Sequence, residues 1–267
     1  RYDIPLEDLE ESEIEIEFNL GSLEIRTGNS DYLLRGAAIF EDARLKPNIR
    51  HKKIGNRSKL HIYTETEDFN KSINSVFDLF DKQDWSSVEN DWKLEFTNQI
   101  PLEYSINLGM AEGVMDFTGQ KIKDMEIECG MGDVSVKIDE PNDVEMRKFT
   151  VETGMGEFNG EGLGNLNPER FKVDCGMGET NLTFNGKIKK DMEGEISVGM
   201  GSVSVELPRN IGAEINSESS FLSNVDLDDF DKIDGSTYRS QNWDDTVFRV
   251  YIRASVGMGS IDIRWID

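Results

Sequence analysis

Carboxylates in this sequence recur at a spacing that would place them in columns. One set directly follows a Gly-Met-Gly motif and another set precedes it, namely Asp133, Glu157 and Glu179, and Glu128, Glu152 and Asp174. In stacked strands neighbouring members would lie about 4.8 Å apart, where like charges repel unless a hard cation such as Ca²⁺ binds between them. Residues 229–235 hold further carboxylates but lack the EF-hand spacing. We therefore favour solvated carboxylates on an outer face over a calcium site.

A second chemical feature is a basic segment in an otherwise acidic chain. Seven bases and a histidine fall within 16 residues, namely Arg44, Lys46, Arg50, His51, Lys52, Lys53, Arg57 and Lys59. Such a patch could hold an anionic lipid, a phosphate-bearing glycan or an acidic envelope protein. The structural alternative, which we favour, is a hairpin whose edge lysines prevent pairing with another chain. The segment is a candidate anion or partner site under the first interpretation.

Motifs for catalysis or metal binding are missing from the sequence. His51 and His61 are the only histidines, and neither has a cysteine or a carboxylate cluster at metal-ligand spacing. No nucleophile elbow, phosphate loop or dinucleotide fingerprint occurs. A β-helical polysaccharide lyase or hydrolase would need bases near its carboxylates, but Lys172 beside Asp174 has no basic neighbour in the repeat register. We therefore predict no catalytic residue, no metal site and no cofactor.

The elements that position these residues follow from a repeated glycine motif. It occurs six times, as Leu108-Gly109-Met110, Cys129-Gly130-Met131-Gly132, Thr153-Gly154-Met155-Gly156, Cys175-Gly176-Met177-Gly178, Val198-Gly199-Met200-Gly201 and Val256-Gly257-Met258-Gly259. Apolar and polar residues alternate on both sides of it, which is the period of a strand. A unit of about 22 residues with two short strands must stack on its neighbours to bury its apolar side. The sequence thus predicts an all-β fold, a parallel β-solenoid (β-helix) with a less regular N-terminal β region and one short helix.

The repeat also predicts which side chains share a column. One inner column should contain Ile127, Val151, Val173 and Ile196. The methionines should form another column and fill the interior, since their unbranched side chains suit irregular space. We favour this over a metal or redox role, because thioether metal sites usually need more convergent partners than one residue per rung. Cys129 and Cys175 share a column two rungs apart, about 9.6 Å, which is too far for a disulfide. Both cysteines are therefore expected to be free and buried.

The chain before the repeats is less regular. Residues 14–25 alternate around Gly21 and indicate a founding rung, and residues 33–40 are apolar enough for a strand. Gly55-Asn56 lies between two further strand-like segments, 48–54 and 59–64, and is typical of a hairpin turn.

One helix is expected, over residues 70–81. Ile73, Val76, Phe77 and Phe80 form an apolar stripe that should cover an exposed sheet edge.

A second interruption separates the last two repeats. Residues 221–225 resemble a degraded rung, and the acidic residues 226–245 are expected to form a surface loop. We divide the chain into an N-terminal β region with a helical insertion, residues 1–100, and a repeat region, residues 101–267. The two regions should be continuous with one another.

The segment Phe18-Asn19-Leu20-Gly21-Ser22-Leu23-Glu24-Ile25, followed by serial Gly-x-Gly corners, resembles the bacterial toast-rack family. That family is related to the extracytoplasmic domains of LiaF-like envelope-stress proteins and to adhesin-like β-solenoids. The chain departs from the family in its corner methionines, where small or aliphatic residues are more usual, and in residues 66–98 and 226–245. The resemblance implies a non-enzymatic role at the cell envelope and names no ligand.

Composition limits the classes of partner. Fifty-three acidic residues against 29 bases give a formal charge of −24, which excludes nucleic acid as a partner. No stretch approaches the 18 apolar residues of a membrane span, and the start at Arg1 leads us to expect a leader or anchor outside this chain. We predict an extracytoplasmic location, in the periplasm or at the cell surface. The expected function is recognition or sensing, with a surface adhesin or glycan-binding protein as alternative and a polysaccharide-processing enzyme less favoured.

Overall fold

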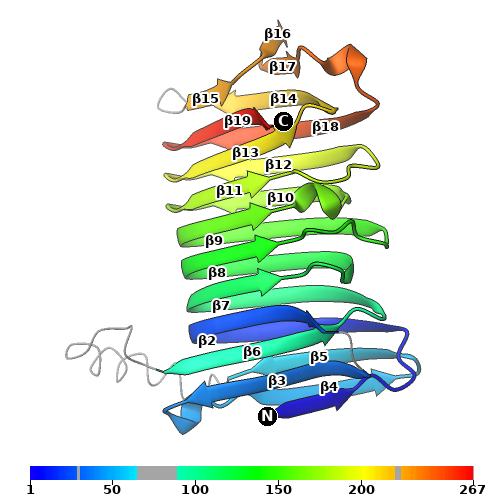
Figure 1. Cartoon of the computed structure of the whole chain (residues 1–267). Helices are drawn as coiled ribbons and strands as arrows, with labels where there is room; N and C mark the ends of the chain where they lie inside the picture. The colour runs from blue at the N-terminus through cyan, green and yellow to red at the C-terminus, as the bar shows by residue number, and fades with distance from the viewer. Residues whose placement is uncertain (29–30, 65–88, 220–223, 267) are drawn as a thin grey trace, which may run out of the picture.

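The computed structural model is an all-β protein, and it describes residues 1–28, 31–64, 89–219 and 224–266. The 19 strands of the described residues belong to one sheet. They stack as rungs along one axis, with the N-terminus near one end and the strands of residues 211–219 and 224–240 at the other (Figure 1). The all-β prediction is confirmed.

The bounds of the strands are as follows. The first half of the sheet contains β1 (Tyr2–Pro5), β2 (Glu11–Gly28), β3 (Tyr32–Phe40), β4 (Asn48–Ile54), β5 (Arg57–Tyr63), β6 (Asn90–Thr97), β7 (Pro101–Asp116), β8 (Lys121–Lys137) and β9 (Met146–Glu161). The second half contains β10 (Pro168–Cys175), β11 (Glu179–Thr183), β12 (Met192–Val198), β13 (Ser202–Pro208), β14 (Ile211–Ser219), β15 (Asn224–Leu227), β16 (Phe230–Asp234), β17 (Thr237–Ser240), β18 (Phe248–Val256) and β19 (Ser260–Ile266).

Helical structure in the described ranges is limited to single 3-10 turns. They are η1 (Ala43–Leu45), η3 (Leu163–Asn165) and η4 (Trp243–Asp245). The predicted helix over residues 70–81, with its stripe of Ile73, Val76, Phe77 and Phe80, lies outside the described residues.

Successive rungs pair in parallel and keep the register of the repeat. β7 pairs with β8 and β8 pairs with β9, so that Met110 lies opposite Met131 and Met131 lies opposite Met155. β9 then pairs with both β10 and β11, because from this rung onward the corner separates two strands. The upper rungs continue in parallel, from β10 to β12 to β18 and from β11 to β13 to β19.

Both ends of the stack depart from the purely parallel arrangement that the sequence predicted. The sheet is mixed, since β3 is antiparallel to β1 and β6, and β17 is antiparallel to β14 and β16. The physical reason is that a terminal rung has no further rung to pair with. Folding the chain back as an antiparallel hairpin uses hydrogen-bonding groups that would otherwise be left at an open edge.

Several less regular segments match their predictions. The founding rung is β2, which pairs in parallel with β7 and places Ile16 opposite Ile106. The predicted hairpin is formed by β4 and β5 around Gly55 and Asn56.

The acidic loop predicted over residues 226–245 is wrong in part. Residues 230–240 form the antiparallel hairpin β16–β17, where Phe230 lies opposite Ser240. The degraded rung predicted over 221–225 begins at Asn224, the first residue of β15, and residues 221–223 lie outside the described residues. The sequence does not reveal this hairpin because β16 is mostly exposed and β17 is mostly half-buried, so neither strand has an alternating buried face.

The core is built from columns of alternating side chains. Ile127, Val151, Val173 and Ile196 are fully buried and lie opposite one another in successive strands, which confirms the predicted inner column. Larger rings fill the lower part, where Phe18 and Trp92 meet edge to face with centroids 4.8 Å apart. Each column buries apolar surface only because the next rung covers it, so the stability of each rung depends on its neighbours.

Buried asparagines close the connections between rungs. The Asn142 side chain donates to Ile122 O at 2.7 Å and accepts from Ile122 N at 3.0 Å. Asn165 acts in the same way, donating to Ile138 O at 3.0 Å and accepting from Lys187 N at 2.9 Å. These amides satisfy backbone groups that leave the strand ladder, which would otherwise be costly to bury.

The glycine corners stack in direct backbone contact. A Cβ built on Gly176 would lie 2.7 Å from Gly154 O, and one built on Gly199 would lie 2.8 Å from Gly176 O. In the five motifs that have a second glycine, that glycine is even closer to its neighbour, and Gly156 also has φ of +121°. A side chain at either glycine position would therefore separate the rungs.

We expect Gly176→Ala to destabilise the protein by about 2 kcal/mol or more, because the added methyl group meets a backbone oxygen that cannot move without separating two rungs. Gly28→Ala is the matched control, since its Cβ would be 3.4 Å from the nearest heavy atom, an ordinary contact. Urea unfolding of both variants measures the difference. Equal midpoints would show that the corners tolerate side chains.

The two cysteines are free and buried, as predicted. Burial, and secondarily the charge of Asp133, raises the pKa of the Cys129 thiol.

We expect both thiols to react with Ellman's reagent far more slowly in the native protein than in denaturant, because only an exposed thiolate attacks it. Rapid labelling of the native protein would contradict this burial.

Candidate functional site

A shallow, solvent-open groove of about 700 Å³ runs across successive rungs beside the first glycine of the corners from Gly109 to Gly199. The backbone of Gly130, Gly154 and Gly176 forms part of its surface, because no side chain stands there. Polar side chains line it at rung intervals, namely Asn107, Glu128, Glu152, Asp174, Ser197 and Ser255. The predicted carboxylate column before the corner is therefore one wall of this groove.

The carboxylates of the groove are only partly neutralised. Glu152 lies opposite both Glu128 and Asp174 in the parallel ladder. Lys172 contacts Asp174 and lies 3.4 Å from the Glu152 carboxylate. Asn107 donates to Glu128 at 2.9 Å. The result is an acidic row in which hydrogen-bond acceptors face solvent.

The carboxylate column after the corner lies outside this groove. Asp133, Glu157 and Glu179 are exposed and lie opposite one another in successive strands. Within the described ranges none of the three forms an ion pair. The carboxylate oxygens of these three residues do not all lie within 4.8 Å of one another, so they do not form the cluster that a Ca²⁺ site would require.

The corner methionines point away from the core, which contradicts the interior column expected from the sequence. Met131, Met155, Met177, Met200 and Met258 have exposed fractions between 39% and 59%. The reason is a change of parity at the corner: Cys129 is buried before it and Val134 after it. One additional residue is accommodated in the bend, and the methionine at its apex is turned toward solvent.

The basic segment is distributed over η1, β4 and β5. Arg44 lies in η1 and pairs with Asp42, and Lys46 is exposed directly after it. Arg50, His51, Lys52 and Lys53 are exposed on β4, and Arg57 and Lys59 are exposed on β5.

Carboxylates of neighbouring segments take up much of this positive charge. Lys59 lies 2.8 Å from Glu13 and 3.0 Å from Glu15. Lys53 contacts Asp8 and lies 2.9 Å from Glu7. Hydrogen bonds to these carboxylates raise the pKa values of both lysines. The proposed anion patch thus stays a prediction, carried mainly by the exposed bases of β4.

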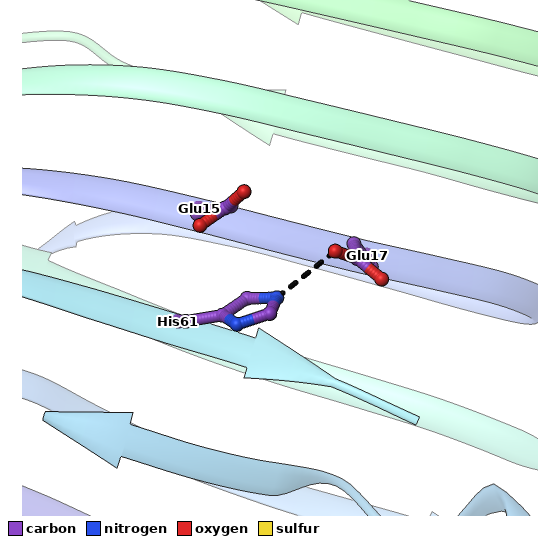
Figure 2. Close-up of side chains that lie close together, drawn as sticks. All are labelled: Glu15, Glu17 and His61. Atoms are coloured by element: carbon purple, nitrogen blue, oxygen red, sulfur yellow. Dashed lines mark hydrogen bonds and ion pairs between the residues drawn. The ribbon is translucent and has the colours of Figure 1, made fainter. Parts of the chain in front are cut away.

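Figure 2 shows a cluster that sequence reasoning missed, formed by Glu15, Glu17 and His61. Their ligand atoms lie within 4.8 Å of one another, and the His61 Nε2 atom is 3.1 Å from Glu17 Oε1. A histidine with two carboxylates is a donor set that suits Zn²⁺. However, a metal here would have to displace the ammonium of Lys59 from Glu15. We therefore interpret the cluster as part of the ion-pair ladder between β2 and β5.

This cluster has no local signature in the sequence. His61 lies opposite Glu15 because β5 pairs in parallel with β2, although the two residues are 46 positions apart in the sequence. The alternation Glu13, Glu15, Glu17 would have placed three carboxylates on one face, but it does not identify the strand that faces them.

No helix in the described part of the chain is long and apolar enough to cross a membrane. No match is found among curated proteins.

Two solved structures resemble this chain. One is a putative cell adhesion protein from Clostridium sporogenes ATCC 15579, 18% identical, with TM-score 0.50 over 99% of this chain and 97% of that one. The other is a putative adhesin from Bacteroides fragilis NCTC 9343, 10% identical over 98% and 94% of the two chains. Its TM-score of 0.31 is too low to support an argument. The first similarity establishes a shared fold alone.

The family comparison covers the N-terminal rungs and the first three Gly-Met corners. Residues 1–161, more than half of the chain, match the model of the N-terminal domain of toast_rack, DUF2154. This match includes the founding strand β2 and the corner glycines that carried the resemblance in the sequence. The chain therefore belongs to the toast-rack family.

Proposed function

We propose that this protein is a non-enzymatic recognition module of the extracytoplasmic cell envelope, built as a β-solenoid. The observation that carries the proposal is the acidic groove along the glycine corners, which extends over successive rungs. Membership of the toast-rack family and a fold shared with a protein described as a cell adhesion protein support this assignment.

The groove suits an extended ligand. Its polar side chains repeat with the rungs, so a linear polymer lying across the strands would meet similar groups at each step. Glu128, Glu152 and Asp174 supply acceptors for amines and hydroxyls. The chain charge of −24 disfavours anionic polymers and favours cationic or neutral ones. A glycan that carries free amino groups fits this chemistry best, and such binding would serve adhesion.

Catalysis is less well supported by the groove. A polysaccharide lyase or hydrolase needs a general acid and a base at the scissile bond. Lys172 does not line the groove, and it pairs with two of the groove carboxylates, Glu152 and Asp174. The pKa of Lys172 is raised, chiefly by its hydrogen bond to Asp174, which opposes a role as general base near neutral pH.

Binding of chitosan hexamer, measured by calorimetry with cellohexaose as neutral comparison, tests this proposal. We expect the wild-type protein to bind the amino-glycan and Glu128→Gln/Glu152→Gln to weaken binding about tenfold or more, because two charge-assisted acceptors are lost. Glu140→Gln/Glu145→Gln is the matched control. It removes the same charge from exposed positions outside the groove.

The outcomes distinguish binding in the groove from attraction by the overall charge of the chain. Equal weakening by both double variants would mean that overall charge alone attracts the glycan, and the groove would lose its assigned role. Absence of binding to either hexamer would overturn glycan recognition.

A further inference from the structure

The column of exposed methionines is not explained by packing. Backbone contact between rungs requires glycine on both sides of the apex, but the apex side chain itself points to solvent. Methionine nevertheless occupies this position in five stacked rungs, as Met131, Met155, Met177, Met200 and Met258. A polar residue would be expected at such an exposed site in a chain of mean hydropathy −0.52. The recurrence therefore indicates a role for the thioether.

Neighbouring apexes are close enough for their thioethers to share a ligand. Met131 lies opposite Met155 in the ladder, and Met177 N donates to Gly154 O at 2.8 Å, which fixes the next apex one rung further. Rungs are about 4.8 Å apart. A methionine side chain has three rotatable bonds, so sulfur atoms from adjacent rungs can converge on one ion.

Charge distinguishes three of these apexes from the others. Met131, Met155 and Met177 are each flanked by a carboxylate before and after the corner, in the two columns described above. Serines occupy both corresponding positions around Met200 and Met258. Of the six flanking carboxylates, Glu152 and Asp174 share Lys172. The remaining negative charge raises the local concentration of cations at the three middle methionines.

We propose that Met131, Met155 and Met177 bind a soft monovalent metal ion, Cu(I), through their thioether sulfurs. Thioethers are soft ligands that select Cu(I) over Mg²⁺, Ca²⁺ and other hard cations. They are neutral, so the flanking carboxylates compensate the charge of the ion without ligating it. The cysteines do not contribute, because Cys129 and Cys175 are buried on the inner side of the corner. The ion keeps its oxidation state, and no electron is transferred.

Titration of the full chain with Ag(I), a redox-stable probe for Cu(I), tests the assignment. Calorimetry gives the affinity, and ¹³C-methyl methionine NMR identifies the residues involved. We expect Met131→Leu/Met155→Leu/Met177→Leu to weaken binding about tenfold or more. Leucine preserves the exposed apolar stripe, so contact with an apolar partner would survive this change. The methyl signals of the three named residues should shift in the wild-type protein.

Two controls separate the site from other sulfur atoms. Met115→Leu/Met125→Leu/Met192→Leu removes the same number of thioethers from buried positions and should leave Ag(I) affinity unchanged. Cys129→Val/Cys175→Val removes both thiols, and valine is already present in that column as Val198. This variant should also retain binding.

Three results would overturn the proposal. They are the absence of Ag(I) binding to the wild-type protein, equal affinity in the corner triple variant, and loss of binding in the cysteine variant.

A competition assay with bicinchoninate under reducing, anaerobic conditions then extends the measurement to Cu(I). Failure to compete for Cu(I) would likewise reject the assignment. None of these outcomes bears on glycan binding, because the methionine and cysteine variants leave the groove carboxylates Glu128, Glu152 and Asp174 in place and glycan binding is measured with a different probe.

Discussion

Backbone contact between the glycine corners is the constraint on which the remaining structure depends. Each corner glycine packs against a carbonyl oxygen of the rung before it, for example Gly199 against Gly176. Rungs can therefore approach at strand spacing through the bend, and the parallel hydrogen bonds continue across it, as from Gly199 N to Cys175 O at 2.8 Å. The inner columns meet because the corners allow this approach.

The same constraint explains where side chains can be displayed. Because the corners from Gly130 to Gly259 have glycine at two positions, the backbone there is bare and a groove forms beside it. The apex residue between them is turned outward, and the residues before and after the motif project as two further columns. A single repeated motif thus produces a groove, a thioether column and two carboxylate columns, which are the surfaces available for recognition.

Among the described residues, carboxylates are paired with bases near the N-terminal end of the stack and are unpaired at some positions further along it. Near the N-terminal end, the carboxylates of β2 pair with the bases of β5, as Glu13 does with Lys59. Further along, Asp133 and Glu157 lie opposite one another without such a partner in the described ranges. Exposed ion pairs contribute little stability, so the first arrangement mainly fixes register, whereas the second leaves a negative field that acts on ligands.

The sequence by itself determined the features that repeat locally. Alternation and glycine spacing were sufficient for the all-β fold, the inner columns, the free cysteines and the Gly55 hairpin, because each depends on residues a few positions apart or one or two repeats apart. Only the tertiary structure decided the outward direction of Met155, since the bend shifts the strand parity by one residue. It also decided the pairing of His61 with Glu17 and of Lys59 with Glu13, because strand neighbours 46 residues apart are selected by stacking rather than by local pattern.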